Sequence, residues 1–363
     1  MPALQALISS APGTAMTVGG ALIGVLFGGL LQRTNYCVMG AVSDWQLSAN
    51  LNRLGAVALG AATAILLVQM SAAAGLVDLS RTMYLTPRIN WAGAIGGGLL
   101  FGIGMVYAGG CPSRSLVRAG GGDFRAVVSL MALGIAAYAT ISGVLGSFRT
   151  GLDTATAIDL RSMGWPTQSL PDALRTLAVP GEWARAIATS AVAIPLLVFS
   201  VGPGKIFHHP RNLVAGLSVG ALAAAGWVLT GLAADDIAAN PVVPQSLSFV
   251  RPVADAIDWI ERSTALGLPG FGAASVFGVA IGGLIAAMLS THGVRYSGFV
   301  DGRDLARHLA GAVAMGIGGV LALGCSIGQG VSGISTLSIQ SILACAAIVS
   351  GAVLGLKLMA RSV

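Results

Sequence analysis

Long runs of apolar residues, separated by shorter polar segments, dominate the hydrophobic pattern of this chain. Runs with few or no charged residues occur at about 17–31, 54–76, 89–110, 126–147, 186–204, 213–233, 270–290, 309–324 and 336–356. A helix needs about 20 predominantly apolar residues to cross the hydrocarbon core of a bilayer. The pattern therefore predicts an all-α polytopic membrane protein with about nine transmembrane helices.

The composition agrees with this prediction and excludes other classes of protein. Only 9% of the 363 residues are charged, against roughly 25% in soluble domains. So few charges cannot cover a soluble surface, which excludes a cytosolic enzyme and a disordered chain. The formal net charge of +6 comes from basic residues that stand singly between apolar runs, so no nucleic-acid partner is indicated. The expected environment is the lipid bilayer.

The distribution of basic residues predicts an orientation in that bilayer. Lys and Arg gather in the short connections 114–125 and 205–211 and again after residue 356. The two long connections, 148–185 and 234–269, hold more than half of the acidic residues. Cytoplasmic loops are enriched in Lys and Arg. We therefore expect the N-terminus outside the cell and the C-terminus in the cytoplasm.

A self-match relates the two halves of the chain. Residues 102–111 read GIGMVYAGGC and residues 316–325 read GIGGVLALGC, with seven identical positions out of ten. In a nine-span chain the first copy runs inward and the second runs outward, so we expect two inverted repeats. Such repeats place a substrate site at their interface. We expect residues 1–150 to form the first repeat, 151–211 an extracytoplasmic loop with a linker span, and 212–363 the second repeat.

Each copy of the self-match ends in a cysteine at a predicted helix break. Gly110-Cys111 precedes Pro-Ser-Arg, and Gly324-Cys325 precedes Ser-Ile-Gly-Gln. Short re-entrant half-helices that begin there would direct free N–H groups into the protein, which favours an anion. Irregular backbone at membrane depth is tolerated where it lines a cavity or is buried in protein. The candidate pathway residues are therefore Cys37, Cys111, Cys325, Gly110, Gly324, Arg114, Ser326 and Gln329.

These candidates have different expected roles. Cys37 lies in a third predicted break, whose counterpart in the second half, residues 235–241, contains no cysteine. We expect Arg114 to attract anions to the cytoplasmic mouth, and Ser326 and Gln329 to donate hydrogen bonds to oxyanion oxygens. Cys345, in the middle of an apolar run, is expected to be a small apolar filler. No C-x-x-C motif or His at zinc spacing is present, so we expect neither a metal nor a cofactor.

The cysteine-bearing segments resemble those of a known family. NYCVMGAVSDW (35–45), GGCPSR (109–114) and GCSIGQGVSG (324–333), in a nine-span chain, are similar to motifs of the YeeE/YedE family of bacterial thiosulfate transporters. The resemblance implies an hourglass-shaped inner-membrane protein in which the thiosulfate sulfur passes between the thiols of Cys37, Cys111 and Cys325. It also implies a separate TusA-like sulfurtransferase as a partner on the cytoplasmic side.

Three hypotheses about function remain open at the level of sequence. The leading one is a non-enzymatic transporter that takes up thiosulfate. The second is a transporter of another sulfur or selenium species. The third is a membrane sulfurtransferase that forms a cysteine persulfide. A relay of hydrogen bonds favours neutral thiols whereas covalent sulfur transfer favours thiolates, and the sequence does not distinguish between them.

Overall fold

The computed structural model describes residues 11–202, 206–234, 242–291, 293–294 and 296–361, most of which lie in helices. The first half contains α2 (Pro12–Thr34), α3 (Val38–Ser48), α4 (Asn52–Ala73), α5 (Gly98–Tyr107), α6 (Pro112–Gly120) and α7 (Phe124–Ile141). A middle part contains α8 (Gly146–Thr156), α9 (Leu170–Thr176) and α10 (Gly181–Val201). The second half contains α11 (Pro210–Leu232), α12 (Arg251–Leu266), α13 (Phe271–Met288), α14 (Gly302–Leu321) and α15 (Ile339–Arg361). Strands β1 (Arg88–Asn90) and β2 (Ala157–Asp159) pair antiparallel.

Eight segments of the described chain are long and apolar enough to cross a membrane, which confirms a polytopic membrane protein. They are α2 with α3, α4, α5 with α6, α7, α10, α11, α13 and α15. The ninth predicted span, at 309–324, corresponds to α14. Arg303, Asp304 and Arg307 occupy the first turns of α14 and leave it less apolar than the other eight. Its small residues face α5 and α7, against which it packs.

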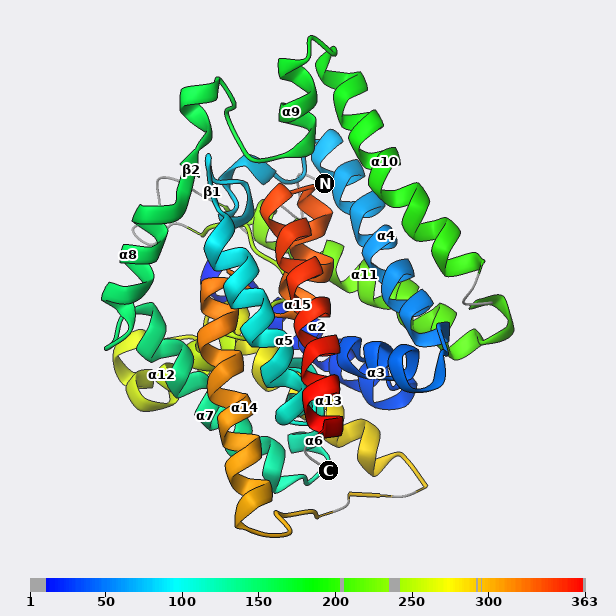
Figure 1. The fold of residues 1–363 in the computed structure, drawn as a ribbon, viewed down its shortest axis with the longest axis vertical. Coiled ribbons are helices and arrows are strands. Elements are labelled where there is room, and N and C mark those ends of the chain that lie inside the picture. The colour runs from blue at the N-terminus through cyan, green and yellow to red at the C-terminus, as the bar shows by residue number, and fades with distance from the viewer. Residues whose placement is uncertain (1–10, 203–205, 235–241, 292, 295, 362–363) are drawn as a thin grey trace.

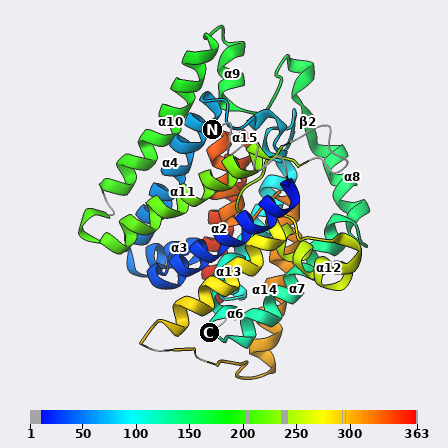
Figure 2. The ribbon, with the colours of Figure 1, turned by 180° about the vertical axis from the view of Figure 1, so that it is seen from behind.

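Helices of the two halves pack against each other in matching pairs. α2 packs along α13 as α4 packs along α11, and α5 packs against α15 as α14 packs against α7. α5 and α14, which carry the two copies of the self-match, also contact each other. α2, α4, α5 and α7 of the first half thus correspond to α11, α13, α14 and α15 of the second half. When each helix is replaced by its counterpart, the list of contacting pairs stays the same. Figures 1 and 2 show these helices as the centre of the molecule, seen from opposite sides.

In the second half, α12 packs as α3 packs in the first half. Residues 235–241 lie outside the described residues, as does Lys205 of the basic connection. The helix that packs against α13 as α3 packs against α4 is α12, which begins after Val250. Val250 therefore occupies the position that Cys37 occupies before α3. A longer connection after α11 displaces this element along the chain, and it brings no cysteine.

The long connection between α7 and α10 folds over one end of the molecule. Figure 1 shows α9 and the small sheet at the end opposite α6, and we term these the α9 end and the α6 end. The Leu170 N–H donates to the Leu337 carbonyl (3.0 Å), and the Ile339 N–H donates to the Gln168 carbonyl (3.1 Å). These bonds fix the connection to the chain just before α15.

Glycines allow the central helices to approach closely. Gly24 and Gly28 of α2 lie directly against the main chain of α13, and Gly278 and Gly282 of α13 lie against the main chain of α2. A side chain at any of the four would overlap the other helix. Because lipid supplies no hydrophobic driving force between helices, close van der Waals contact between small residues stabilises their association.

Replacement of Gly28 by alanine should therefore destabilise the protein, because a Cβ there would overlap the Val279 carbonyl. We expect a loss of roughly 1–3 kcal/mol, the usual cost of overpacking. Gly29→Ala is a matched control, since its Cβ would lie 3.7 Å from the nearest heavy atom, the Gly282 carbonyl oxygen. Thermal unfolding of the purified protein in detergent measures the stability of both variants. Equal midpoints for Gly28→Ala and Gly29→Ala would contradict the close contact of Gly28 with α13.

Candidate functional site

Three helix interruptions place three cysteines in equivalent positions. Cys37 is the N-cap of α3, Cys111 is the N-cap of α6, and Cys325 directly precedes the helical residues 326–336. A residue in the left-handed region stands two positions before each cysteine: Asn35 (φ 55°), Gly109 (φ 70°) and Leu323 (φ 57°). Left-handed backbone ends a helix, and the cysteine then begins the next one. The three breaks are therefore built alike.

The two copies of the self-match also share their hydrogen bonds. The N–H of Gly110 donates to the Met105 carbonyl (2.9 Å), and the N–H of Gly324 donates to the Gly319 carbonyl (2.8 Å). After the break, the carbonyl of each cysteine accepts from the residue four positions later, at 2.9 Å for Cys111 and 2.7 Å for Cys325. The identical residues thus fold into the same helix end and the same helix start twice.

Each cysteine sulfur lies at the amino end of its short helix. The Cys37 sulfur accepts from the Gly40 N–H (3.4 Å) and the Cys325 sulfur from the Gly328 N–H (3.2 Å). The Cys111 sulfur lies 3.3 Å from the Ser113 hydroxyl. The first N–H groups of a helix carry a partial positive charge. All three sulfurs therefore occupy an environment that favours electron-rich ligands.

The three cysteines, far apart in sequence, meet at one buried place. The thiols of Cys37 and Cys111 are close enough to interact directly, and the Ser326 hydroxyl, next to Cys325, lies beside Cys111. Cys37, Cys111 and Cys325 expose 7%, 1% and 1% of their surfaces. Cys345, within α15, is less buried and lies near Cys325 and Gly330, but at no helix break. We term the three cysteines at the breaks the cysteine cluster.

The remaining candidates around the breaks have distinct surroundings. Gln329 donates its amide to the Ala322 carbonyl (2.5 Å), which braces the turn before Cys325. Its Oε1 and the Ser326 hydroxyl are buried and have no hydrogen-bond partner among the described residues. Gly110 and Gly324 lie beside Arg114 and Gln329 respectively, but neither has a left-handed backbone. The Ser326 hydroxyl is thus the freer donor of the two proposed ones.

Tyr36 is a neighbour of the cluster that the sequence analysis did not single out. Its side chain is 4% exposed and lies near Cys37 and Cys111. Its hydroxyl has no hydrogen-bond partner among the described residues. A buried phenol normally finds a partner, whereas this hydroxyl lies against Gly60 of α4. Its position next to Cys37 in the NYC segment was the only signal for it in the sequence.

Arg114 carries positive charge to the edge of the cluster. Its guanidinium donates to the side chain of Asn35 (2.9 Å) and to the Leu31 carbonyl (3.3 Å), and it has no acidic partner among the described residues. Arg53, close by, pairs with Asp44 at 3.1 Å. The charge of Arg114 therefore remains uncompensated beside Cys37 and Cys111.

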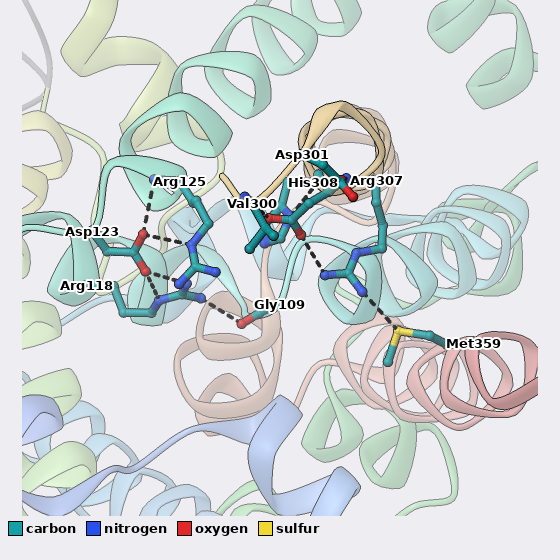
Figure 3. Close-up of polar contacts among 10 residues, drawn as sticks. Gly109, Arg118, Asp123, Arg125, Val300, Asp301, Arg307, His308 and Met359 are labelled. Carbon is teal, nitrogen blue, oxygen red and sulfur yellow. Dashed lines mark hydrogen bonds and ion pairs between the residues drawn. The ribbon is translucent and has the colours of Figure 1, made fainter. Parts of the chain in front are cut away.

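An ion-pair network holds the break before Cys111 at the α6 end. Figure 3 shows Asp123 between Arg118 and Arg125, with Arg118 also reaching the Gly109 carbonyl at 2.9 Å. Asp123 accepts from Arg118 at 2.5 Å and from Arg125 at 3.2 Å. Burial alone would raise the pKa of the Asp123 carboxyl, but the bonds from Arg118 and Arg125 outweigh it and hold this pKa below its ordinary value. The network fixes the left-handed turn that positions Cys111.

The site offers donors for an anion rather than ligands for a metal. Within the described part of the chain, no group of three or more His, Cys, Asp or Glu side chains converges as a metal site would require. The buried groups around the cysteines are thiols, hydroxyls, an amide and helix N–H groups. These groups suit a weakly held anion with a polarisable end.

Comparison with known proteins places the chain in a family. Residues 33–354 match the family described as "Sulphur transport". The chain belongs to this sulphur transport family. The match confirms the resemblance inferred from the three cysteine motifs, and it makes the protein a multi-pass membrane member of a transporter family.

Two relatives cover most of the chain. "Thiosulfate transporter TsuA" of Escherichia coli (strain K12) is 26% identical over 330 residues, which is 87% of this chain and 87% of that protein. The protein of the same name from Spirochaeta thermophila is 26% identical over 352 residues, 90% of this chain and 93% of that one. "Probable transporter YedE" of Salmonella typhimurium is 36% identical over 100 residues, 27% of this chain and 23% of its own length.

Replacement of Asp123 by asparagine should lower stability, because Arg118 and Arg125 lose a shared carboxylate. The expected loss is about 2 kcal/mol at pH 7, in the range for hydrogen bonds to charged groups. A depressed carboxyl pKa stabilises the folded state above the ordinary value of about 4, and this contribution is lost as the pH falls below it. The difference in thermal midpoint between wild type and Asp123→Asn should therefore shrink at acidic pH. A difference independent of pH would contradict this role for the carboxylate.

Proposed function

We propose that this protein takes up thiosulfate across the bacterial inner membrane, through the centre where Cys37, Cys111 and Cys325 meet. The observation that carries the proposal is this cluster, in which three helix breaks far apart in sequence deliver a thiol to one buried place. Two relatives that cover most of the chain are named thiosulfate transporters. Their names supply the substrate, and the cluster supplies chemistry that suits it.

The chemistry of thiosulfate fits the groups in the cluster. The ion carries two negative charges, one soft terminal sulfur and three hard oxygens. Thiol S–H groups meet the sulfur, while hydroxyls such as those of Tyr36 and Ser326 and helix N–H groups meet the oxygens. Each of these contacts is weak. A path of weak contacts in series admits the ion and also releases it, which conduction requires.

The proposed architecture is a pair of inverted repeats with the cluster at their interface. Two observations support it: the reciprocal packing of α2, α4, α5 and α7 with α13, α11, α15 and α14, and the shared hydrogen bonds of the breaks at Cys111 and Cys325. Residues 1–150 and 212–363 would then form the repeats, and residues 151–211 the outer loop with a linker span. α6 and residues 326–336 would be the re-entrant half-helices.

The proposed orientation places the α6 end in the cytoplasm. Arg114, Arg118 and Arg125 lie there, and positive charge in short loops marks the cytoplasmic side. Arg114 would then attract the anion at the inner mouth. A separate TusA-like sulfurtransferase would receive the substrate at the same end.

Labelling of introduced cysteines with a membrane-impermeant maleimide tests the orientation. Ser162 is exposed at the α9 end, and Gly298 is exposed in the connection at the α6 end. The two test variants are Ser162→Cys and Gly298→Cys. We expect the first to react in intact spheroplasts and the second only after the membrane is permeabilised. The wild-type protein, with its cysteines buried or half-buried, is the control for background reaction. The reverse pattern of labelling would contradict the orientation.

Uptake of labelled thiosulfate tests the function itself. In cells without their own sulfate and thiosulfate importers, wild type should support uptake, and Cys37→Ala, Cys111→Ala and Cys325→Ala should each reduce it at least about tenfold, the effect of one lost interaction of roughly 1.4 kcal/mol. Cys345→Ala is the matched control, because it removes a thiol outside the cluster and should retain uptake. Expression and thermal midpoints must match across variants. Full uptake by all three cluster variants would refute the relay.

The alternatives predict different results in the same cells. Uptake of labelled sulfite or of a labelled selenium oxyanion, with no uptake of thiosulfate, would assign another substrate. A sulfurtransferase would use a thiolate that attacks the terminal sulfur of thiosulfate, forming a persulfide and releasing sulfite. That reaction adds the mass of one sulfur atom to a single cysteine. Intact-mass analysis after exposure to thiosulfate should show no such gain if the relay is non-covalent.

A further inference from the structure

A polar pocket of about 350 Å³ opens at the α9 end, outside the cysteine cluster. Its walls come from the chain after α4, from α9, and from the first turns of α10. Its lining includes Gln69, Ser80, Arg175, Arg185 and Thr336. A volume of this size accommodates an ion such as thiosulfate together with water.

Two guanidiniums and two carboxylates line this pocket, those of Arg175, Arg185, Asp78 and Asp172. Asp172 is fully engaged, since it pairs with Arg175 at 3.0 Å and accepts from the Thr167 hydroxyl. Asp78 accepts from the Ser80 hydroxyl at 2.7 Å. Arg185, half-buried in the wall, makes no side-chain hydrogen bond or ion pair with any described residue. Its guanidinium is therefore free to bind an anion inside the pocket.

The floor of the pocket connects with the segment that begins at Cys325. Thr336, which lines the pocket, is the last residue of the helical segment 326–336. At about 1.5 Å of rise per residue, this segment spans on the order of 15 Å. Its buried face is polar: Ser332 and Ser335 are fully buried, and Ser335 accepts from Trp227 Nε1 at 3.1 Å. The pocket and the cysteine cluster thus lie at opposite ends of one polar helix.

The walls of the pocket are fixed to that same segment. Gln69 of α4 donates to the Ser335 carbonyl (2.8 Å). Gln168, fully buried just before α9, accepts from the N–H groups of Ile339 and, through its side chain, Gln340. The α7–α10 connection is therefore anchored where the segment ends, and Arg185 is held at a defined distance from the floor.

We propose that this pocket is the outer capture site for the transported dianion, with the Arg185 guanidinium binding its oxygens. The inference rests on the proposed function and adds a second binding site to it. A planar guanidinium presents parallel N–H groups to two oxygens of one ion. Capture at Arg185 raises the concentration of anion above the polar segment that leads to Cys325.

Kinetics of thiosulfate uptake in Arg185→Gln test the capture site. We expect KM to rise about tenfold, the effect of losing one charge-assisted hydrogen bond, with Vmax within twofold of wild type. Arg185→Lys keeps the positive charge but loses the parallel N–H groups of the guanidinium, so its KM should rise less. Arg161→Gln is the matched control, since Arg161 lies exposed on the same connection and does not line the pocket. An unchanged KM in Arg185→Gln, or an equal rise in Arg161→Gln, would overturn the proposal.

Equilibrium binding separates failure of this inference from failure of the proposed function. Calorimetric titration of the purified protein with thiosulfate should show binding that Arg185→Gln weakens about tenfold and that Arg161→Gln leaves intact. If wild-type cells take up thiosulfate but Arg185→Gln binds it as tightly as wild type, the capture site is wrong and the function stands. If wild-type cells show no uptake, the proposed function fails, and binding that depends on Arg185 would still establish an anion site.

Discussion

Backbone polarity inside a membrane is the constraint on which the rest of this structure depends. Three helices stop and restart in the buried interior of the protein, and each break leaves N–H and carbonyl groups that need partners there. All three breaks have the same local structure: a residue with left-handed backbone, one further residue, and then a cysteine at the start of the next helix. The sulfur takes the place of the usual oxygen at the helix start, as the bonds from Gly40 and Gly328 show. One group therefore serves both the fold and the proposed path.

The dense packing of glycines follows from the same constraint. The breaks remain dry and ordered only if neighbouring helices enclose them completely. α5 and α14, which lead into two of the breaks, contact each other through Gly104, Gly311 and Gly318 with no intervening side chains. α2 and α13 approach in the same way. This close approach buries the cysteines together with the Ser326 side chain beside them. The many glycines and the burial of the thiols are thus connected, because the glycines allow the helices to enclose the cysteines.

The sequence predicted those parts of the site that short-range pattern controls. The match of residues 102–111 with 316–325 predicted two breaks, and both formed with the same hydrogen bonds. It did not predict that Gly109 and Leu323 have the left-handed backbone. Several contacts also escaped it: Arg118 on the Gly109 carbonyl, Tyr36 beside Cys111, and the packing of α12 on α13, which matches that of α3 on α4. These depend on which helices become neighbours, which one sequence does not specify.

The distribution of charge gives the proposed path a physical logic. Two arginines without an acidic partner among the described residues lie along it, Arg185 in the pocket at the α9 end and Arg114 at the edge of the cluster that faces the α6 end. Between them the buried groups are neutral thiols, hydroxyls and amides. A dianion needs positive charge to leave water, but a full charge at the dry centre would bind it strongly and slow its release, since Coulomb energies grow as the dielectric constant falls. Cations at the wetter ends and polarisable neutral groups at the centre therefore combine capture with passage, and cysteine supplies such a group without interrupting the start of a helix.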